Sequence, residues 1–205
     1  MSYVKTFDGS RMVRCSALHY VLVKLNGANL QMHPTLETRH LTLRPLVLQD
    51  LDAYVDFWRN AEVVRYITGT PISREQSWKR LLGTVGHWQL LGFGFFAIEE
   101  KASGRFIGEA GFQEMRRDLL PSIEGTLETG WGILPAYQGK GYAREAVSTA
   151  MTWAEMAFPT LDYSCIIDPE NRASMHLAAR LGFSEDTMTA YSGKPIMILR
   201  KARVS

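Results

Sequence analysis

The sequence of 205 residues has little of several features that mark special classes of protein. Its two cysteines, Cys15 and Cys165, are too few and too far apart for a disulfide framework or a metal knuckle, so we expect a reducing compartment and no bound metal. No apolar run approaches the roughly 18 residues of a membrane span, and His19 and Lys24 interrupt the apolar patch that a secretory signal would need. The net charge of +2 does not indicate nucleic-acid binding. We therefore expect a cytoplasmic protein that contacts neither membrane nor nucleic acid.

The composition is that of an ordinary globular protein, with 46% hydrophobic and 21% charged residues. The length suits one α/β domain with a substantial core and is short for two. Residues 1–33 show no sustained helical or strand period, and Met32 closely precedes the first periodic segment. We interpret residues 1–33 as an N-terminal extension, either disordered or upstream of the true start, and residues 34–205 as the domain.

The first half of this domain is predicted to contain a strand and two helices. Residues 41–45 alternate apolar and polar side chains and end in proline, which is typical of a half-buried strand. Asp50 is the predicted N-cap of the first helix. Ser73 and Gln76 have the spacing of a capping box and predict the start of the second. The apolar residues that we expect this second helix to bury are Trp78, Leu81, Leu82 and Val85.

The second half alternates strands with helices. The predicted strands are residues 93–99, 105–112, 126–134, 161–167, 185–191 and 196–201. The predicted helices are a long one after the loop at 135–141 and another from about 172 to 181, with Gly182 as its stop. This order predicts an α+β fold with a mixed, mostly antiparallel central sheet and flanking helices.

The segment Gln138-Gly139-Lys140-Gly141-Tyr142-Ala143 lies between a predicted strand and a predicted helix. Glycines there allow a tight turn, and the loop amides with the positive end of the helix form an anion site suited to a pyrophosphate. Each such contact is worth roughly 0.3–1 kcal/mol, so several donors must converge. The segment is neither a Walker A loop nor a Rossmann fingerprint, and a plain strand-to-helix turn is the alternative interpretation.

This segment resembles a known family motif. The pattern Gln138-x-x-Gly141-x-Ala143 is similar to the Q/R-x-x-G-x-G/A motif of the GNAT superfamily of N-acetyltransferases. Other stretches look like its RimJ/RimL-like branch of ribosomal-protein N-terminal acetyltransferases: residues 36–45, 128–146, 171–174 and 181–183. The resemblance covers about residues 36 to 200, with the motifs in the family's order.

The resemblance implies where acetyl-coenzyme A would bind. In the GNAT fold, the strand ending near Leu134 and the strand at 161–167 splay apart, and the cofactor lies in the gap. Backbone groups around Ile133 would pair with the pantetheine arm like an added strand. Asn171 would hydrogen-bond this arm, and Ser174 would lie near the sulfur. The cofactor-binding residues expected in the loop are Gln138, Gly139, Lys140, Gly141, Tyr142, Ala143 and Arg144.

Acetyl transfer to an amine needs an unprotonated nitrogen and a thiolate that leaves. An α-amino group has a pKa of about 7.7–8.0 and a lysine about 10.4, so a terminal amine is partly neutral at pH 7. The resemblance places Glu128 toward the acceptor, and Glu109 lies in the preceding strand; either would take the proton, directly or through water. Many relatives use a tyrosine acid where this chain has Ala178, so Ser174 is the candidate that replaces it.

Each of these candidates also has a structural alternative. The two glutamates would be solvated or salt-bridged strand residues, and the serine a helix-surface residue. We expect a primary amine as acceptor, most simply a protein or peptide N-terminus, and a monomer or homodimer. The alternatives are a small-molecule amine such as a polyamine, an amino-acid analogue or an antibiotic, and a non-catalytic acyl-coenzyme A-binding domain.

Overall fold

A computed structural model describes residues 6–7, 10–11, 18–21 and 33–203. Its strands are β1 (Thr6–Phe7), β2 (Ser10–Arg11), β3 (Leu18–Val21), β4 (His33–Glu37), β5 (Leu41–Pro45), β6 (Phe95–Glu100), β7 (Arg105–Gln113), β8 (Leu127–Ile133), β9 (Tyr163–Ile167), β10 (Ser184–Tyr191) and β11 (Lys194–Lys201). Its α-helices are α1 (Leu51–Arg59), α2 (Ala61–Val64), α3 (Arg74–Leu91), α4 (Tyr142–Ala157) and α5 (Arg172–Arg180). The short 3₁₀ turns are η1 (Leu48–Asp50) and η2 (Pro135–Tyr137).

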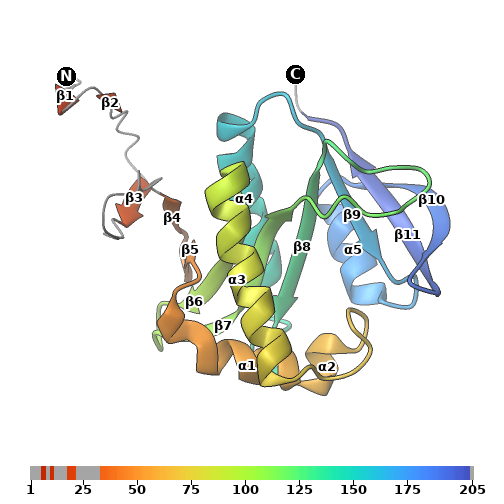
Figure 1. The fold of residues 1–205 in the computed structure, drawn as a ribbon, viewed down its shortest axis with the longest axis horizontal. Helices are drawn as coiled ribbons and strands as arrows, with labels where there is room; N and C mark the ends of the chain where they lie inside the picture. The colour runs from red at the N-terminus through yellow and green to blue at the C-terminus, as the bar shows by residue number, and fades with distance from the viewer. Residues whose placement is uncertain (1–5, 8–9, 12–17, 22–32, 204–205) are drawn as a thin grey trace.

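The main sheet has the order β10-β11-β9-β8-β7-β6-β5-β4-β3 (Figure 1). Its neighbouring strands pair antiparallel except β8 and β9, which are parallel and pair only at Leu127 with Tyr163 and Glu128 with Ser164. Beyond Glu128 the two strands are no longer paired, which is the splay expected from the sequence resemblance. The predicted mixed, mostly antiparallel α+β fold is confirmed.

The two faces of this sheet carry separate cores. In β6, Phe96 and Ile98 belong to the larger cluster, which also contains the buried face of α4, such as Ala150. Ala97 points to the other face, where it packs with Phe57 of α1. This alternation is the period-two pattern of a sheet covered on both sides. The sheet is therefore covered on both faces by helices.

The second predicted helix, α3, begins where expected but buries a different face. The capping box is confirmed, because Ser73 Oγ accepts from Gln76 N–H at 3.2 Å and Gln76 Oε1 accepts from Ser73 N–H at 2.8 Å. The prediction of the buried face was wrong except at Leu81: Trp78, Leu82 and Val85 are exposed, and the buried residues are Ser77, Leu81, Thr84 and Trp88. The buried hydroxyls bond back to carbonyls of their own helix, so these polar side chains enter the core fully paired.

Asp50 occupies the N-cap position of α1, as predicted, but it does not cap the helix with its side chain. Instead its carboxylate accepts from Arg44 at 2.7 and 2.8 Å and from Val47 N–H at 2.9 Å, which fastens the chain between β5 and α1. The short helix α2 was missed by the sequence analysis and is capped by Asn60.

The predicted extension at residues 1–33 lies largely outside the described residues. Within the described part, β3 pairs antiparallel with β4, with Leu18 opposite Leu36. The domain boundary between residues 33 and 34 stays a prediction. No helix in the described part of the chain is long and apolar enough to cross a membrane.

Candidate functional site

The loop between β8 and α4 has the geometry of an anion cradle. Gly139 and Gly141 have φ values of +75° and +83°, in the left-handed region that side chains disfavour. Gly141 is the N-cap of α4, and no side chain caps this end. The first N–H groups of a helix have no intrahelical acceptor, so those of Tyr142, Ala143 and Arg144 are available to a ligand.

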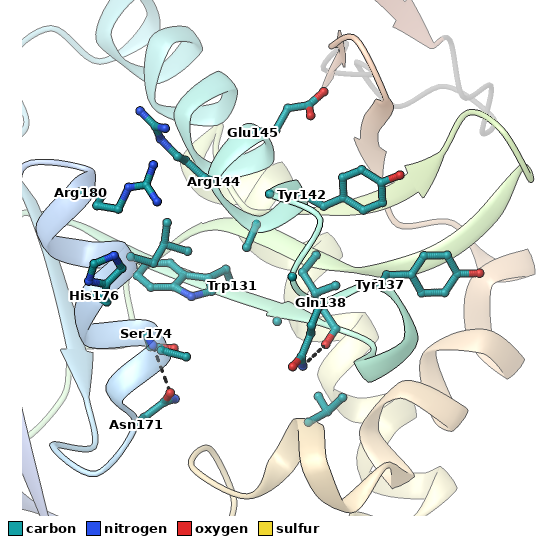
Figure 2. A pocket seen from close by; sticks show the side chains of 18 of the residues that line it. Trp131, Tyr137, Gln138, Tyr142, Arg144, Glu145, Asn171, Ser174, His176 and Arg180 are labelled. Atoms are coloured by element: carbon teal, nitrogen blue, oxygen red, sulfur yellow. Dashed lines mark hydrogen bonds between the residues drawn. The ribbon is translucent and has the colours of Figure 1, made fainter.

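Gln138 ties this loop to the end of β8. Its side-chain amide nitrogen donates to the carbonyl oxygen of Ile133 at 2.9 Å (Figure 2). Leu134 N–H donates to the carbonyl oxygen of Ile107 on β7 at 2.8 Å. In an antiparallel ladder every second residue of a strand bonds to the same neighbouring strand, and the residues between them point their N–H groups to the other side. The N–H groups of Ile133 and Trp131 therefore face the gap toward β9, where a bound chain would pair with them.

A cavity of about 820 Å³ opens beside the loop, within the size range of ligand pockets. It runs from the start of α4 to α5 on one side and to α2 on the other (Figure 2). Of the residues predicted from the sequence, those that line it are Ile133, Gln138, Gly139, Gly141, Tyr142, Ala143, Arg144, Asn171 and Ser174. Lys140, Glu109 and Glu128 are not part of its lining. The structure thus brings nine of the predicted residues together.

Asn171 and Ser174 stand at the start of α5 with a defined geometry. Asn171 Oδ1 accepts from the backbone N–H of Ser174 at 3.1 Å, which makes Asn171 the N-cap (Figure 2). This bond uses the amide oxygen and orients the amide nitrogen as the remaining donor. Ala178, the position for which the sequence resemblance implied a tyrosine, is fully buried in the core.

Several lining residues were missed by the sequence analysis. Ser174, Leu177 and Arg180 follow at intervals of three, so they share a helix face, and this spacing was a readable signal for Arg180. His176 is exposed and also lines the cavity. Figure 2 shows Arg144 and Arg180 at one end of the cavity. No sequence signal pointed to the residues contributed from the other side: Glu62, Val63, Tyr66 and Ile67.

Glu128 is buried and held by three hydrogen bonds. Arg117 Nε donates to its Oε2 and Arg117 Nη2 to its Oε1, both at 2.9 Å, and Gln113 Nε2 donates to Oε1 at 2.8 Å. Its position in β8 is the last that pairs with β9, at the apex of the splay. A carboxylate has about four acceptor sites, so one on Oε2 remains open. Its catalytic role stays a prediction.

Glu109 is buried on the face of the sheet that α1 covers. Its Oε2 atom has no hydrogen-bond partner among the described residues. Burial raises the pKa of Glu109, while Arg80 and the hydroxyl of Tyr54 act in the opposite direction. The hydroxyl of Tyr54 is likewise buried and unpartnered, and burial together with Glu109 raises its pKa. Glu109 is cross-strand neighbour of Gly132, which lines the cavity, so it lies behind the cavity wall.

The described residues contain no group of three or more His, Cys, Asp or Glu side chains that could hold a metal ion. Cys165 is buried, and burial with the charge of Glu128 raises the pKa of its thiol. A thiol that stays protonated is a poor nucleophile and a poor metal ligand. The polar part of the cavity consists of the backbone N–H groups at the start of α4, of Arg144 and Arg180, and of Asn171 and Ser174 at the start of α5.

Comparisons with known proteins define the family. Residues 40–184 match the model of the acetyltransferase (GNAT) domain, so the chain belongs to this family and has the fold of an acetyltransferase. It is similar to the structure of the acetyltransferase from Agrobacterium tumefaciens strain C58, at 28% identity and a TM-score of 0.71, covering 86% of this chain and 99% of that one.

Two further relatives differ in the acceptor that their names state. One is the spermidine N(1)-acetyltransferase of Escherichia coli strain K12, 28% identical over 69% of this chain and 72% of that protein. The other is the structure of the ribosomal-protein-S5-alanine acetyltransferase from Vibrio fischeri, at 20% identity and a TM-score of 0.66, covering 82% and 96% of the chains. The second likeness concerns the fold alone. The chain is a GNAT acetyltransferase whose acceptor these comparisons leave open.

Proposed function

We propose that this protein transfers the acetyl group of acetyl-coenzyme A to the α-amino group of a protein or peptide N-terminus, by direct attack in a ternary complex. The observation that carries the proposal is the continuous cavity. It joins the anion cradle at α4 to the polar start of α5 and opens on the other side toward α2. A cofactor whose pyrophosphate lies at the start of α4 and whose thioester reaches the middle of the cavity would leave the α2 side for an acceptor.

The cofactor would lie along this cavity in an extended form. The free N–H groups at the start of α4 would hold the pyrophosphate, and Arg144 and Arg180 would contact the phosphate that lies farther from these N–H groups. The pantetheine arm would pair with the backbone of Ile133 and Trp131 like an added strand. Asn171 would donate its amide nitrogen to a carbonyl of this arm. These residues therefore fit the pyrophosphate and the pantetheine arm of the cofactor.

The transfer itself needs few groups. The amine nitrogen attacks the thioester carbonyl, its bond to carbon forms, and the carbon–sulfur bond breaks with its electron pair going to sulfur. Ser174 would donate a hydrogen bond to this sulfur. Glu128 would take the proton of the nitrogen through a water at its open Oε2 position, with Glu109 as the alternative carboxylate. Positioning of the two substrates would supply much of the remaining rate.

The charges of the cavity favour a singly charged acceptor over a polyamine. Its acidic lining residues are Glu62 and Glu145, and Glu145 is occupied by His40 at 2.8 Å. Glu62 is thus the acidic lining residue on the acceptor side. A polycation such as spermidine binds best where several carboxylates converge, and this lining does not provide such a set. An α-amino group is partly neutral at pH 7 and needs little help to react.

A thiol-release assay with acetyl-coenzyme A tests the proposal. The amines to compare are short peptides with free N-termini, spermidine and an aminoglycoside, each with acetylated peptide as blank. We expect peptide-dependent release of coenzyme A that exceeds the other amines. Preference for spermidine or the aminoglycoside would establish the small-molecule alternative. Calorimetric binding of acetyl-coenzyme A without turnover of any amine would establish a non-catalytic domain.

A further inference from the structure

Glu145 places a negative charge of the chain itself beside the anion cradle. It lies in the first turn of α4 and lines the cavity, and its N–H donates to the carbonyl oxygen of Gly141 at 3.0 Å. Side chains of a helix lean toward its N-terminus, so Glu145 shares a face with Gly141 and Tyr142. The free N–H groups of that end attract carboxylates as they attract phosphates. An unrestrained Glu145 carboxylate would therefore compete with a pyrophosphate for them.

His40 holds this carboxylate by two contacts. Its backbone N–H donates to Oε1 at 2.9 Å, and its ring Nδ1 lies 2.8 Å from Oε2. A ring nitrogen that faces a carboxylate carries a hydrogen, so Nδ1 donates whether the ring is neutral or charged. Burial raises the pKa of Glu145, but hydrogen bonds from Thr38 and His40 outweigh it, so this pKa is lowered and the carboxylate is charged. Figure 2 shows Glu145 pointing away from Gln138 and Ser174.

The position of His40 is determined from outside α4. His40 lies in the turn between β4 and β5, and its carbonyl oxygen accepts from the N–H of Lys101, just after β6, at 2.9 Å. Its ring lies 5.9 Å from the ring of Tyr142, whose hydroxyl donates to Glu100 of β6 at 2.9 Å. The start of β5 and the end of β6 therefore determine where His40 holds Glu145.

Stability is a weak explanation for this contact. The side chains of His40 and Glu145 are 45% and 22% exposed, and ion pairs that water reaches contribute little to the free energy of unfolding. An acidic residue in the first helical turn is stabilised by the helix N-terminus without any partner. The contact adds a defined position, because it turns the carboxylate toward the β4–β5 turn.

We propose that His40 is a positioning residue, which holds the Glu145 carboxylate against the β4–β5 turn and so leaves the N–H groups at the start of α4 to the pyrophosphate of the cofactor. The inference rests on the cofactor site of the proposed function and adds to it a residue outside the cavity lining. A carboxylate released from His40 would meet the phosphates as a like charge and would take a donor from them. Loss of this contact would therefore weaken the binding of the phosphates and spare the pantetheine arm.

Two variants of His40 with the same side-chain shape test this role. In His40→Asn the amide nitrogen takes the place of Nδ1 and still donates to Glu145, whereas His40→Asp presents a like charge and repels it. The quantity to measure by calorimetry is the dissociation constant, for coenzyme A and for pantetheine, which has no phosphate. His40→Asp should bind coenzyme A about tenfold more weakly, and pantetheine within about twofold of wild type. His40→Asn should bind both as the wild type does.

Glu145→Gln supplies the control, because it removes the charge that His40 restrains. Alone it should bind coenzyme A at least as tightly as the wild type. Combined with His40→Asp it should restore the affinity to within about twofold of wild type, since a glutamine brings no charge to the cradle. No restoration would overturn the proposal, because the introduced charge would then act on the phosphates by itself. An equal loss for coenzyme A and pantetheine would overturn it too, since His40 would then serve the fold alone.

A folded His40→Asp that binds coenzyme A as tightly as the wild type also rejects the role. If circular dichroism shows that His40→Asp does not fold, His40→Ala takes its place. It removes only the ring donor, so the expected loss is about threefold, and Glu145→Gln must again restore the affinity. A smaller loss, or one that is not restored, counts against the proposal.

Failure of the proposed function gives a different result. A wild type that binds coenzyme A but acetylates no peptide rejects that function, and the binding measurements still decide the role of His40. Absence of coenzyme A binding to the wild type would overturn the inference itself, since no pyrophosphate would then lie at the start of α4.

Discussion

Asn171 accepts a hydrogen bond from the backbone N–H of Ser174 at 3.1 Å, and we propose that the same side chain has a second task in binding the cofactor. Its oxygen caps α5, and its nitrogen faces a cavity that Ser174 also lines. The two tasks separate chemically, because the cap needs an acceptor and the ligand needs a donor.

The first prediction separates these tasks by substitution. Asn171→Asp keeps an oxygen for the cap and loses the donor, so thermal stability should stay near wild type while affinity for coenzyme A falls about tenfold. Asn171→Ala should lose both, with a stability cost of about 1 kcal/mol. Thermal melts and calorimetry on the same samples measure the two effects. Equal affinity in wild type and Asn171→Asp would remove the side chain from cofactor binding.

The second prediction concerns Gly141 at the start of α4. A Cβ there meets open space, so the strain of Gly141→Val comes from the left-handed φ of +83° alone. The loop should shift, and acetyl-coenzyme A affinity should fall by roughly tenfold or more in a folded protein. Gly83→Ala, in α3 with open space around it, is the control and should bind as the wild type does. Unchanged affinity of a folded Gly141→Val would contradict the role of the loop.

The third prediction separates chemistry from binding at Glu128. Glu128→Gln should leave acetyl-coenzyme A affinity nearly unchanged, because Glu128 does not line the cavity. Turnover at pH 7 should fall by about 10²- to 10⁴-fold, and the loss should shrink as pH rises and free amine becomes abundant. Steady-state kinetics over about pH 6.5 to 9.5, a range that brackets the pKa of an α-amino group, measure the loss of turnover and its dependence on pH.

Two variants serve as comparisons for this experiment. Ser174→Ala should lower turnover with little change in the pH profile, because the role that we propose for Ser174 is at the sulfur. Glu109→Gln tests the second candidate carboxylate. Near wild-type turnover of Glu128→Gln at pH 7, with a large loss in Glu109→Gln, would assign the role of proton acceptor to Glu109. Small losses in both would leave water as the proton acceptor.

The fourth prediction concerns stability and pH at Glu109. Burial raises its pKa in the folded protein above the unfolded value, so the folded state binds this proton more tightly. The resulting stability is fully present below the unfolded pKa of about 4.3 and is lost as pH rises through the folded pKa. Glu109→Gln should remove this loss, so its melting temperature relative to wild type should be higher at pH 8 than at pH 5. A difference independent of pH would mean that Glu109 ionises as freely in the folded as in the unfolded chain.

Much of the fold could be predicted from local patterns. Strand alternation at 41–45, the Ser73–Gln76 capping box and the glycines before α4 act through the backbone of their own segment, so the sequence carries their signal. The buried face of α3 escaped prediction because Ser77 and Thr84 satisfy their hydroxyls within the helix and become suitable for a core. Apolar residues alone do not reveal such a face.

The sequence by itself determined the order of the helices and strands from β5 onward, except α2, and it determined the family motif. It also indicated the residues proposed to hold the cofactor, because they lie in two continuous segments, 133–144 and 171–174. Only the tertiary structure determined the acceptor side. It brings α2 to the cavity, and it places Arg117 of a loop against Glu128 of a strand. Burial makes that pairing obligatory, since an isolated buried carboxylate is costly. Its partner depends on how β7, β8 and β10 meet in space, which no local spacing records.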